Sequence, residues 1–497
     1  MKFYITTPLY YVNAEPHIGH TYTTIAADCL ARFYRMDGYK VFFLTGTDEH
    51  GQKIATSAEE KSISPKELSD KMAQVYLDLW KTLEISYDRF IRTTEPIHEE
   101  VVKKVFSTLL KNQDLYLGEY KGFYCIHCES YVIPETKQQV PLCPDCFRPV
   151  KQIVEPSYFF KLSKYEKLIK EHIENNPDFI KPDFRKSEVS NFINKGLLDL
   201  SITRATSSWG IQSPTPEKFP IYVWFDALLN YLTGIGYLYN NELFEEYWPP
   251  DVQLIGKDIM RFHHIIWPAI LLSLNLPIPK TIFAHGWWII GKDKISKSKG
   301  NVISPQNIIK DYGVPAFRYF LLREIPFGLD GEYSEENLKK RYNSDLANDL
   351  GNLLNRTLNL VEKTCNGKIP KGMVDENFQK IIEETFTQYK EEMKQLSFYH
   401  GIEKIWQLIN HLNKFLDEKS PWRLEKKDSE NILYYVLEGI RISALFLAPI
   451  IPETSRKIWK MLGIEKDPTK ENFNIRLERL KPGQNIGKRE ILFKRRN

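Results

Sequence analysis

At the beginning of the chain, the spacing of hydrophobic residues changes from that of a strand to that of a helix and back again. Residues 2–7 are predicted to form a short strand, because all of them after Lys2 are aromatic or β-branched. From about His17 to Met36 the apolar residues are spaced as on one face of a helix, and Gly38 is the predicted stop. Residues 41–46 predict a buried strand. Strand, helix and strand in this order form a βαβ unit, which predicts a parallel sheet.

Beyond this unit the pattern changes twice. More helix is predicted to about residue 113, and residues 118–156, rich in Gly, Pro and Cys, are typical of a small inserted domain. Strand-like segments return at 222–227, 252–256 and 281–290, with a helix over 258–274, so a doubly wound domain is expected to resume near residue 217. Later residues predict a C-terminal bundle of amphipathic helices, over 335–365, 376–396, 400–418, 429–448 and 450–462.

Composition narrows the class of protein. With 497 residues, 42% hydrophobic and 27% charged, the chain is expected to form about three soluble globular domains. The net charge of +4 is too small to indicate a nucleic-acid-binding protein by itself. The last 22 residues hold 8 basic and 2 acidic side chains, a weak pointer to nucleic acid or a partner that a solvated chain end explains equally well. The sequence predicts neither a secretory signal nor a membrane span, which needs an apolar run of ~18 residues.

Four of the six cysteines form two Cys-x2-Cys pairs, Cys125 with Cys128 and Cys143 with Cys146. Two such pairs can supply four thiolates in a tetrahedron, which favours zinc. Because four protein ligands leave no open position, the expected role is structural, holding an insertion that lacks a core of its own. The alternative, four unrelated cysteines, is much less favoured by this spacing.

The start of the first predicted helix carries Pro16-His17-Ile18-Gly19-His20. A helix N-terminus presents free N–H groups and a positive dipole, which suit phosphate. His17 and His20 are three residues apart and can project from one side of that turn, and Gly19 leaves room for a flat ring. Two surface histidines on a capped helix explain the same residues about as well.

A second charged motif is Lys294-Ile295-Ser296-Lys297-Ser298-Lys299-Gly300, after a strand-like segment. A cationic loop with hydroxyl groups could close over a polyphosphate and neutralise it in a transition state. Taken alone, an exposed basic turn is the simpler interpretation.

Together the two motifs resemble the HIGH and KMSKS signatures of class I aminoacyl-tRNA synthetases. Five stretches, in this order along the chain, are similar to the methionyl-tRNA synthetase family: PLYYVNAEPHIGH (8–20), TGTDEHGQK (45–53), YVWFDALLNY (222–231), IGKDIMRFHHIIWPA (255–269) and GNLLNR (351–356). The resemblance covers essentially the whole chain.

Two alternatives stay open at this point. One is a class I synthetase for valine, isoleucine, leucine or cysteine. The branched-chain enzymes carry a large editing insertion for which 497 residues leave no room, and the cysteine enzyme uses zinc inside its catalytic site. The other is a catalytically inert zinc-ribbon RNA-binding protein on a similar scaffold, which the intact histidine and lysine motifs disfavour.

The resemblance implies an α/β fold: a doubly wound, parallel-sheet, Rossmann-like catalytic domain with a small zinc-binding insertion and a C-terminal α-helical bundle. The catalytic domain is expected over residues 1–116 and 217–293, and the connective insertion over 117–216. Residues 294–346 are the implied KISKS loop and stem-contact region, and residues 347–497 the helical anticodon-binding domain.

The resemblance also implies a role for each matching residue. The implied catalytic residues are His17, His20, Lys294 and Lys297, and the implied ATP-binding residues are His17, Gly19, His20, Gly256, Asp258 and Lys297. Asp48 matches the acidic residue that pairs with the amino group of methionine. The implied methionine pocket comprises Leu9, Tyr11, Asp48, Trp224, Ala227, Tyr231, Ile259 and His263. Without the resemblance most of these would be assigned to the core.

In the helical part, Asn352 and Arg356 lie at i and i+4 and share a helix face, and Trp422 follows Pro421. An aromatic ring near Arg and Asn suits an unstacked RNA loop. These three residues match the family's anticodon-reading positions, although on their own they would be interpreted as structural.

The implied cofactors are one structural Zn²⁺ per chain and Mg²⁺ accompanying ATP, which is a substrate. The implied partners are methionine, ATP and tRNA(Met), with no membrane, in the cytoplasm. Many relatives carry a further C-terminal tRNA-binding OB-fold that is not found in this sequence. A short monomer, a trimmed chain and a chain completed by a separate OB-fold subunit are the alternatives.

Overall fold

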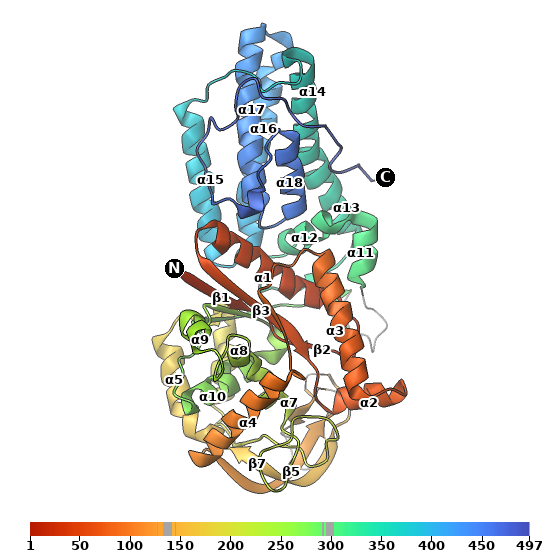
Figure 1. Cartoon of the computed structure of the whole chain (residues 1–497), viewed down its shortest axis with the longest axis vertical. Coiled ribbons are helices and arrows are strands. Elements are labelled where there is room, and N and C mark those ends of the chain that lie inside the picture. Colours follow the sequence, from red (N-terminus) through yellow and green to blue (C-terminus); the bar gives the residue numbers. More distant parts are fainter. Residues whose placement is uncertain (127, 133–141, 145, 291–292, 295–302, 497) are drawn as a thin grey trace. The chain divides into compact units, whose positions relative to one another are not determined.

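The computed structural model in Figure 1 describes residues 1–126, 128–132, 142–144, 146–290, 293–294 and 303–496. The chain divides into two compact units. The sheet unit consists of residues 2–16 and 42–285, and the helical unit of residue 1, residues 17–41 and residues 286–497.

A seven-stranded sheet organises the sheet unit. Its strand order is β2-β3-β1-β10-β11-β8, with β4 paired to β3. The pairs β1/β10, β10/β11, β11/β8, β2/β3 and β3/β4 are parallel, which confirms the predicted parallel α/β sheet. The strands are β1 (Lys2–Thr6), β2 (Tyr10–Tyr11), β3 (Lys40–Asp48), β4 (Arg89–Arg92), β8 (Ile180–Lys181), β10 (Val252–Gly256) and β11 (Thr281–His285).

In this order β1 lies between β3 and β10, so the chain continues from β1 to one side of the sheet and later resumes on the other side. Open α/β sheets bind ligands outside the carboxyl ends of the strands at such a reversal of strand order. The β3 strand ends at Asp48 and the β10 strand ends at Gly256, so two of the predicted site residues lie at this edge.

Helices cover the sheet unit and complete its core. Buried side chains of α4 (Pro96–Lys111) and α10 (Trp267–Ser273), such as Phe106 and Trp267, join Tyr4 and Leu44 from the strands in one large cluster. The other helices are α2 (Gln52–Glu60), α3 (Pro65–Thr82), α5 (Glu166–Asn175), α6 (Lys186–Ile193), α7 (Val223–Leu228), α8 (Asn230–Thr233), α9 (Asn241–Tyr247) and the π-helix η4 (Phe262–Ile266).

Residues 222–227 correct one expectation from the sequence. This segment is not a strand: Val223–Leu228 form the short helix α7, and Tyr222 is its extended N-cap. The aromatic and β-branched residues favoured a strand, but periodicity cannot separate a short buried strand from a short buried helix. The helical prediction that ran to residue 113 likewise missed β4, and residues 281–290 form two strands, β11 and β12 (Trp288–Ile290), instead of one.

A second, antiparallel sheet lies within the region predicted as an insertion. Its strand order is β6-β5-β7-β9, from β5 (Leu115–Cys125), β6 (Ser130–Val132), β7 (Lys151–Phe160) and β9 (Leu200–Ser201). The long β5/β7 pair runs from Leu115 opposite Phe160 to Tyr124 opposite Lys151. At the far end of this pair the cysteines Cys125 and Cys143 form a small separate core with Val132 and Val150.

The helical unit confirms the predicted C-terminal bundle. In Figure 1 the long helices α14 to α17 run side by side, and α15 and α17 both pack on α16. The elements of this unit are α1 (Ile18–Met36), α11 (Pro305–Tyr312), α12 (Val314–Arg323), α13 (Glu335–Arg341), the π-helix η6 (Tyr342–Asn352), α14 (Leu353–Cys365), α15 (Glu376–Lys394), α16 (Phe398–Lys419), η7 (Pro421–Arg423), α17 (Lys426–Leu447), α18 (Pro452–Met461) and the strands β12, β13 (Asp293–Lys294) and β14 (Gly331–Glu332).

A buried ion pair ties α1 to α12 inside the helical unit. Nη2 of Arg318 lies 2.6 Å from the carboxylate of Asp28, and both side chains are almost fully buried. Arg318 also donates to the main-chain oxygens of Ile450 and Pro449, at 2.8 and 3.2 Å. Across the described residues, every helix is too short or too polar to cross a membrane.

Candidate active site

Asp48 is a buried carboxylate at the end of β3. It lies opposite Tyr11 of β2 and is 3% exposed. Its Oδ1 atom has no hydrogen-bond partner among the described residues. Burial raises the pKa of Asp48 well above 3.8, and the nearby charges of Asp226 and Glu129 raise it further. The His50 main chain donates a hydrogen bond to the Asp48 carboxylate, but a buried oxygen without a partner costs stability, so Oδ1 calls for a cationic or donor ligand.

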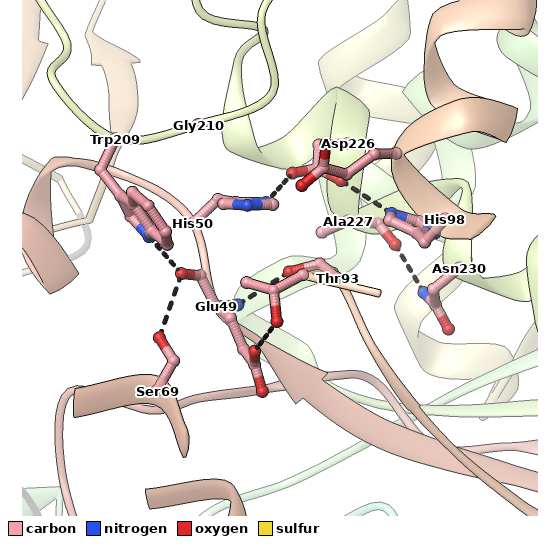
Figure 2. A network of polar contacts seen from close by, with 12 residues as sticks. Glu49, His50, Ser69, Thr93, His98, Trp209, Gly210, Asp226, Ala227 and Asn230 are labelled. Carbon is pink, nitrogen blue, oxygen red and sulfur yellow. Dashed lines mark hydrogen bonds and ion pairs between the residues drawn. The ribbon is translucent and has the colours of Figure 1, made fainter. Parts of the chain in front are cut away.

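The neighbouring carboxylate, Glu49, is in contrast fully satisfied. Its two oxygens accept from Nε and Nη2 of Arg92, at 2.7 and 2.9 Å. Thr47 and Thr94 also donate to it, and its main-chain N–H donates to Thr93 at 2.9 Å. Its main-chain oxygen accepts from the Trp209 indole at 2.6 Å, as Figure 2 shows. These bonds hold the turn that presents Asp48.

Asp226 of α7 is satisfied by two histidines. Its oxygens lie 2.7 Å from Nδ1 of His50 and 2.8 Å from Nε2 of His98 (Figure 2). Burial opposes the charged form of His50, but attraction by Asp226 outweighs it and raises the His50 pKa above 6.5. Burial likewise disfavours the charged form of Asp226, and the nearby His50 nevertheless lowers the Asp226 pKa.

Glu129 reaches this region from the segment just after Cys128. Its carboxylate accepts from the Tyr11 hydroxyl at 3.1 Å and from the Lys53 main-chain N–H at 2.8 Å. A side chain at Gly51, whose φ is 109°, would place Cβ only 2.5 Å from Glu129 Oε1. The tight fit requires glycine there and locks Glu129 against the turn that follows Asp48.

The charge balance around β3 therefore singles out Asp48. Within the described residues, Glu49 has Arg92 and Asp226 has two histidines. Glu129 has a hydroxyl and an N–H donor, and Lys53 attracts it. Asp48 alone of the four retains an oxygen with no partner. A ligand that carries an ammonium group would complete the set.

Aromatic rings line the neighbourhood of Asp48. Trp224 of α7 stacks on Phe262 with ring centroids 3.8 Å apart and planes 7° apart. Tyr11 meets Trp224 edge to face at 6.4 Å. Leu9, Trp224 and Ile259 are partly buried against the main core, and Ala227 is buried. Flat, polarizable walls of this kind suit a thioether side chain.

His263 is a neutral donor and acceptor in the same unit. Its Nδ1 lies 3.0 Å from the Ile259 carbonyl oxygen, which can only accept, so Nδ1 carries the proton. Nε2 then accepts from the Tyr231 hydroxyl at 2.8 Å. Burial lowers the pKa of His263 to about 3, which keeps the ring uncharged. Of the predicted methionine pocket, the structure thus joins Tyr11 with Asp48 and Trp224, and Tyr231 with His263 and Ile259.

The two predicted nucleotide histidines cap α1 in the helical unit. Nδ1 of His17 accepts from the Gly19 N–H at 3.1 Å, and Nδ1 of His20 accepts from the His17 N–H at 3.2 Å. The rings stack with centroids 3.8 Å apart. Because both Nδ1 atoms accept, the proton of each neutral ring is on Nε2, which is a donor suited to a phosphate oxygen.

Three of the remaining predicted nucleotide residues, Gly256, Asp258 and Lys294, lie within the part of the chain that the structure describes. Gly256 ends β10, and a Cβ there would lie 2.6 Å from Oδ1 of Asp258. Lys294 is the last residue of β13, opposite Ile289. Lys297 and the rest of the predicted KISKS loop lie outside the described residues.

The four predicted metal ligands come together. The Sγ atoms of Cys125, Cys128, Cys143 and Cys146 all lie within 4.8 Å of one another. The Cys125 and Cys146 sulfurs are 3.6 Å apart, close to the edge of about 3.8 Å expected for a tetrahedron with metal–sulfur bonds of ~2.3 Å. Four sulfurs at this separation can hold one metal ion, and sulfur ligands of this number favour zinc.

The predicted anticodon residues lie on three elements of the helical unit. Asn352 ends η6 and is exposed, Arg356 lies in α14, and Trp422 lies in η7 with 46% of its surface exposed. The Arg356 guanidinium pairs with the carboxylate of Asp417 in α16. An exposed Trp is unusual for a packing residue and leaves a ring face for stacking.

Comparison with known families follows the same order along the chain. A family model described as tRNA synthetases class I (M) matches residues 3–155 and 147–358. A second, described as the anticodon binding domain of methionyl tRNA ligase, matches residues 368–497. The chain belongs to the methionyl-tRNA synthetase family. This membership decides against the class I synthetases for valine, isoleucine, leucine and cysteine.

Other methionyl-tRNA synthetases are similar over nearly the whole chain. The methionine–tRNA ligase of Caldanaerobacter subterraneus subsp. tengcongensis is 48% identical, over 99% of this chain and 78% of that protein. The methionine–tRNA ligase of Thermotoga maritima is 46% identical, over 100% of this chain and 80% of that protein. The solved structure of Mycobacterium tuberculosis methionyl-tRNA synthetase in complex with methionyl-adenylate has 39% identity and a TM-score of 0.95, covering all of both chains.

Sequence reasoning missed four residues of this methionyl-tRNA synthetase site. His50 and Asp226 stand inside the motifs TGTDEHGQK and YVWFDALLNY, where a charged residue beside an expected pocket residue was the available signal. His98 and Glu129 had no signal, because they come from α4 and from the metal-ligand segment and reach the site only through tertiary contacts.

Proposed function

We infer that the chain is a methionine–tRNA ligase, which activates methionine with ATP and transfers it to the 3′ end of tRNA(Met). The observation that carries this inference is the partnerless, buried Asp48 oxygen beside an aromatic wall. An α-ammonium group satisfies the carboxylate, and a thioether suits the rings. The methionyl-adenylate complex of the M. tuberculosis relative supports the same intermediate here.

The reaction needs positioning and charge stabilisation more than covalent help. A carboxylate oxygen of methionine bonds to the α-phosphorus of ATP, and the bond to the bridging oxygen breaks, releasing pyrophosphate. The acyl group then passes to the 3′-terminal adenosine of the tRNA, releasing AMP. We assign Asp48 to the methionine ammonium group, and the Nε2–H groups of His17 and His20 to ATP. Mg²⁺ accompanies ATP as part of the substrate.

The test of this function is pyrophosphate exchange into ATP, measured with methionine, valine, isoleucine, leucine and cysteine in turn. Exchange that depends on methionine alone is the expected result. Exchange with another of these amino acids would contradict the assignment. No exchange with any of them, by a folded protein that binds RNA, would favour an inert RNA-binding protein instead.

We propose the remaining site residues by resemblance, supported by their places in the two units. Leu9, Tyr11, Trp224, Ala227, Tyr231, Ile259 and His263 form the methionine pocket with Asp48, and Gly19, Gly256 and Asp258 contact ATP. The proposed domains are residues 1–116 and 217–293 for catalysis, 117–216 for the insertion, 294–346 for the KISKS loop and stem contact, and 347–497 for the anticodon.

For the KISKS loop we propose that Lys294 and Lys297 neutralise the phosphates of ATP. Lys297→Ala should slow adenylate formation and leave methionine binding nearly unchanged, since this contact matters mainly in the transition state. Single-turnover kinetics of adenylate formation, with methionine affinity measured by calorimetry, gives both quantities. An unchanged rate with weaker methionine binding would contradict the assignment.

We propose that Cys125, Cys128, Cys143 and Cys146 hold one structural zinc ion per chain. A bound zinc ion supplies the folding energy that this small cysteine-lined core lacks. Metal analysis of the purified protein should find one zinc per chain. Cys143→Ser should lower the zinc content and expose the remaining thiols to alkylation in the native state. Full alkylation of all four thiols in a zinc-free native protein would rule out the site.

We propose that Asn352, Arg356 and Trp422 read the anticodon of tRNA(Met). Stacking of one RNA base on the exposed Trp422 ring contributes about 1–3 kcal/mol. Trp422→Ala should therefore cripple aminoacylation of tRNA and leave methionine-dependent pyrophosphate exchange near the wild-type rate. A control variant should not disturb the packing of the helices, which excludes Phe415→Ala in α16, because the Phe415 ring stacks on Tyr435. Leu424→Ala, an exposed change two residues away, should affect neither assay.

Equal loss of both activities in the Trp422 variant would indicate a structural Trp, because a packing defect damages both reactions.

We assign the enzyme to the cytoplasm, where it meets uncharged tRNA. We also propose a separate tRNA-binding OB-fold subunit as a partner, which co-purification from the native source tests.

A further inference from the structure

A buried polar cluster joins the two walls of the proposed methionine pocket. Asp226 accepts from His50, which follows β3, and from His98 of α4 (Figure 2). His98 Nδ1 also contacts the Thr233 hydroxyl of α8 at 3.0 Å. The side chains of His50, His98 and Asp226 are 4%, 0% and 0% exposed, so their polar atoms depend on one another for hydrogen bonds and not on water.

The cluster residues are close neighbours of pocket residues along the chain, on both elements. His50 lies two residues after Asp48, and Asp226 lies between Trp224 and Ala227 in α7. A shift of the Asp226 carboxylate would therefore move the aromatic wall relative to Asp48. Because α7 has only six residues and no side-chain cap, its position depends on such tertiary contacts more than on its own hydrogen bonds.

The cluster also controls the charge that Asp48 experiences. The Asp226 carboxylate is one of the groups that disfavour ionised Asp48, together with Glu129 and Glu49. The charged groups that act on His50 are Asp226, Glu99 and Glu49, all acidic. The Asp226 carboxylate in turn interacts with His50 and His98. A proton on His50 therefore offsets the negative charge closest to it and makes ionised Asp48 easier to form.

We propose that His50, Asp226 and His98 are positioning residues for methionine: they hold the pocket walls in place, and the proton on His50 offsets the Asp226 charge so that Asp48 stays ionised to receive the ammonium group. This proposal rests on the proposed function and goes beyond it. None of the three touches the substrate. Their effect is on methionine affinity, and the affinity for ATP is unaffected.

The proposal sets the direction of a pH effect. With His50 protonated, the Asp226 charge is balanced and Asp48 binds the methionine ammonium group. As the pH rises from 6.5 through the higher pKa of folded His50, the balancing proton is lost and methionine affinity falls. The uncompensated Asp226 charge should weaken methionine binding about tenfold.

The experiment is calorimetric titration of the 497-residue chain with methionine, without ATP, between pH 6.5 and 9. Deprotonation of free methionine contributes equally for every variant, so differences between variants report the protein. Asp226→Asn removes the charge and keeps the shape. Its affinity should fall less with pH than that of the wild type, by about tenfold over the range. His50→Gln removes the titrating group and should flatten the profile in the same way.

His98→Gln tests the positioning role separately. It should weaken methionine binding severalfold at every pH and leave the KM for ATP unchanged, since it alters only the anchor of α7. His172→Gln is the matched control, because His172 is half-buried in α5 and outside the cluster. This control should follow the wild type throughout.

The outcomes are distinguishable. Wild-type protein that binds no methionine would refute the proposed function itself. Normal wild-type binding, with Asp226→Asn and His50→Gln both following the wild-type pH profile, would overturn the charge role alone. An unchanged methionine affinity in His98→Gln, or an equal loss for ATP, would overturn the positioning role. If Asp226→Asn does not fold, the His50 and His98 variants decide both points.

Discussion

Asp48→Asn should raise the KM for methionine about ten- to a hundredfold and leave the KM for ATP nearly unchanged. The substitution keeps the shape of the side chain but removes the charge that we propose pairs with the ammonium group. A lost charge-assisted hydrogen bond costs about 1.5–3 kcal/mol, which corresponds to this factor. Steady-state pyrophosphate exchange at varied methionine and varied ATP measures both constants. Asp183→Asn, an exposed change in the same unit, is the control.

The same variant should be more stable than the wild type when methionine is absent. Because the pKa of folded Asp48 is raised above 3.8, its protonated form is favoured by folding. The stabilising contribution of that proton is complete at low pH and is lost as the pH rises through the folded pKa. At neutral pH the wild type therefore carries the free-energy cost of burying this ionisable carboxyl group, which Asn removes. Thermal unfolding without methionine should show a higher Tm for Asp48→Asn than for the wild type. If the KM for methionine of this variant is unchanged, Asp48 does not belong to the methionine site.

Asp28→Ala should destabilise the helical unit by about 3–5 kcal/mol, because it removes one carboxylate of a buried ion pair with Arg318. The two carbonyl oxygens that Arg318 also contacts carry only partial charges and do not replace a carboxylate. Urea unfolding followed by circular dichroism gives the free energy of unfolding, with a slope that reports whether the transition stays cooperative.

Two further variants test this account. Glu453→Gln breaks the exposed Lys457–Glu453 pair of α18 and should cost at most about 0.5 kcal/mol. Replacing both buried partners, with Asp28→Leu and Arg318→Met together, should recover part of the loss, because the buried guanidinium is removed together with its carboxylate, although Arg32 also loses its contact with Asp28. A loss below about 1 kcal/mol in Asp28→Ala would show that water or another group already compensates the pair.

The parts of the fold that the sequence predicted are those written in local patterns. The helical spacing from His17 to Met36 predicted α1, and the spacing of four cysteines predicted a cluster that the structure brings within 4.8 Å. Long amphipathic stretches predicted the bundle helices to within a few residues. In each case neighbours in the chain carry the information, because helix faces and metal-ligand pairs repeat over short separations.

The parts that could not be predicted depend on contacts between distant residues. Asp226 meets His50 and His98 from 176 and 128 residues away, and no periodicity records such a contact. Residues 222–227 were assigned to a strand because their four aromatic and branched residues, Tyr222 to Phe225, look alike in a buried strand and a buried helix. What decides for α7 is the surrounding packing, which a single sequence does not display.

The Glu129 contact matters for anyone who would shrink this enzyme into a smaller scaffold. The hairpin that follows Cys125 looks like a peripheral element that could be removed without affecting the catalytic sheet. Yet its Glu129 carboxylate closes against Gly51 and Tyr11, and the Glu129 main-chain oxygen accepts from the Tyr222 hydroxyl at 2.6 Å. Excising the hairpin would leave a hole in the wall of the proposed amino-acid pocket and would remove the Glu129 acceptors of two tyrosine hydroxyls. A minimal version must therefore retain the hairpin or rebuild that wall with new side chains.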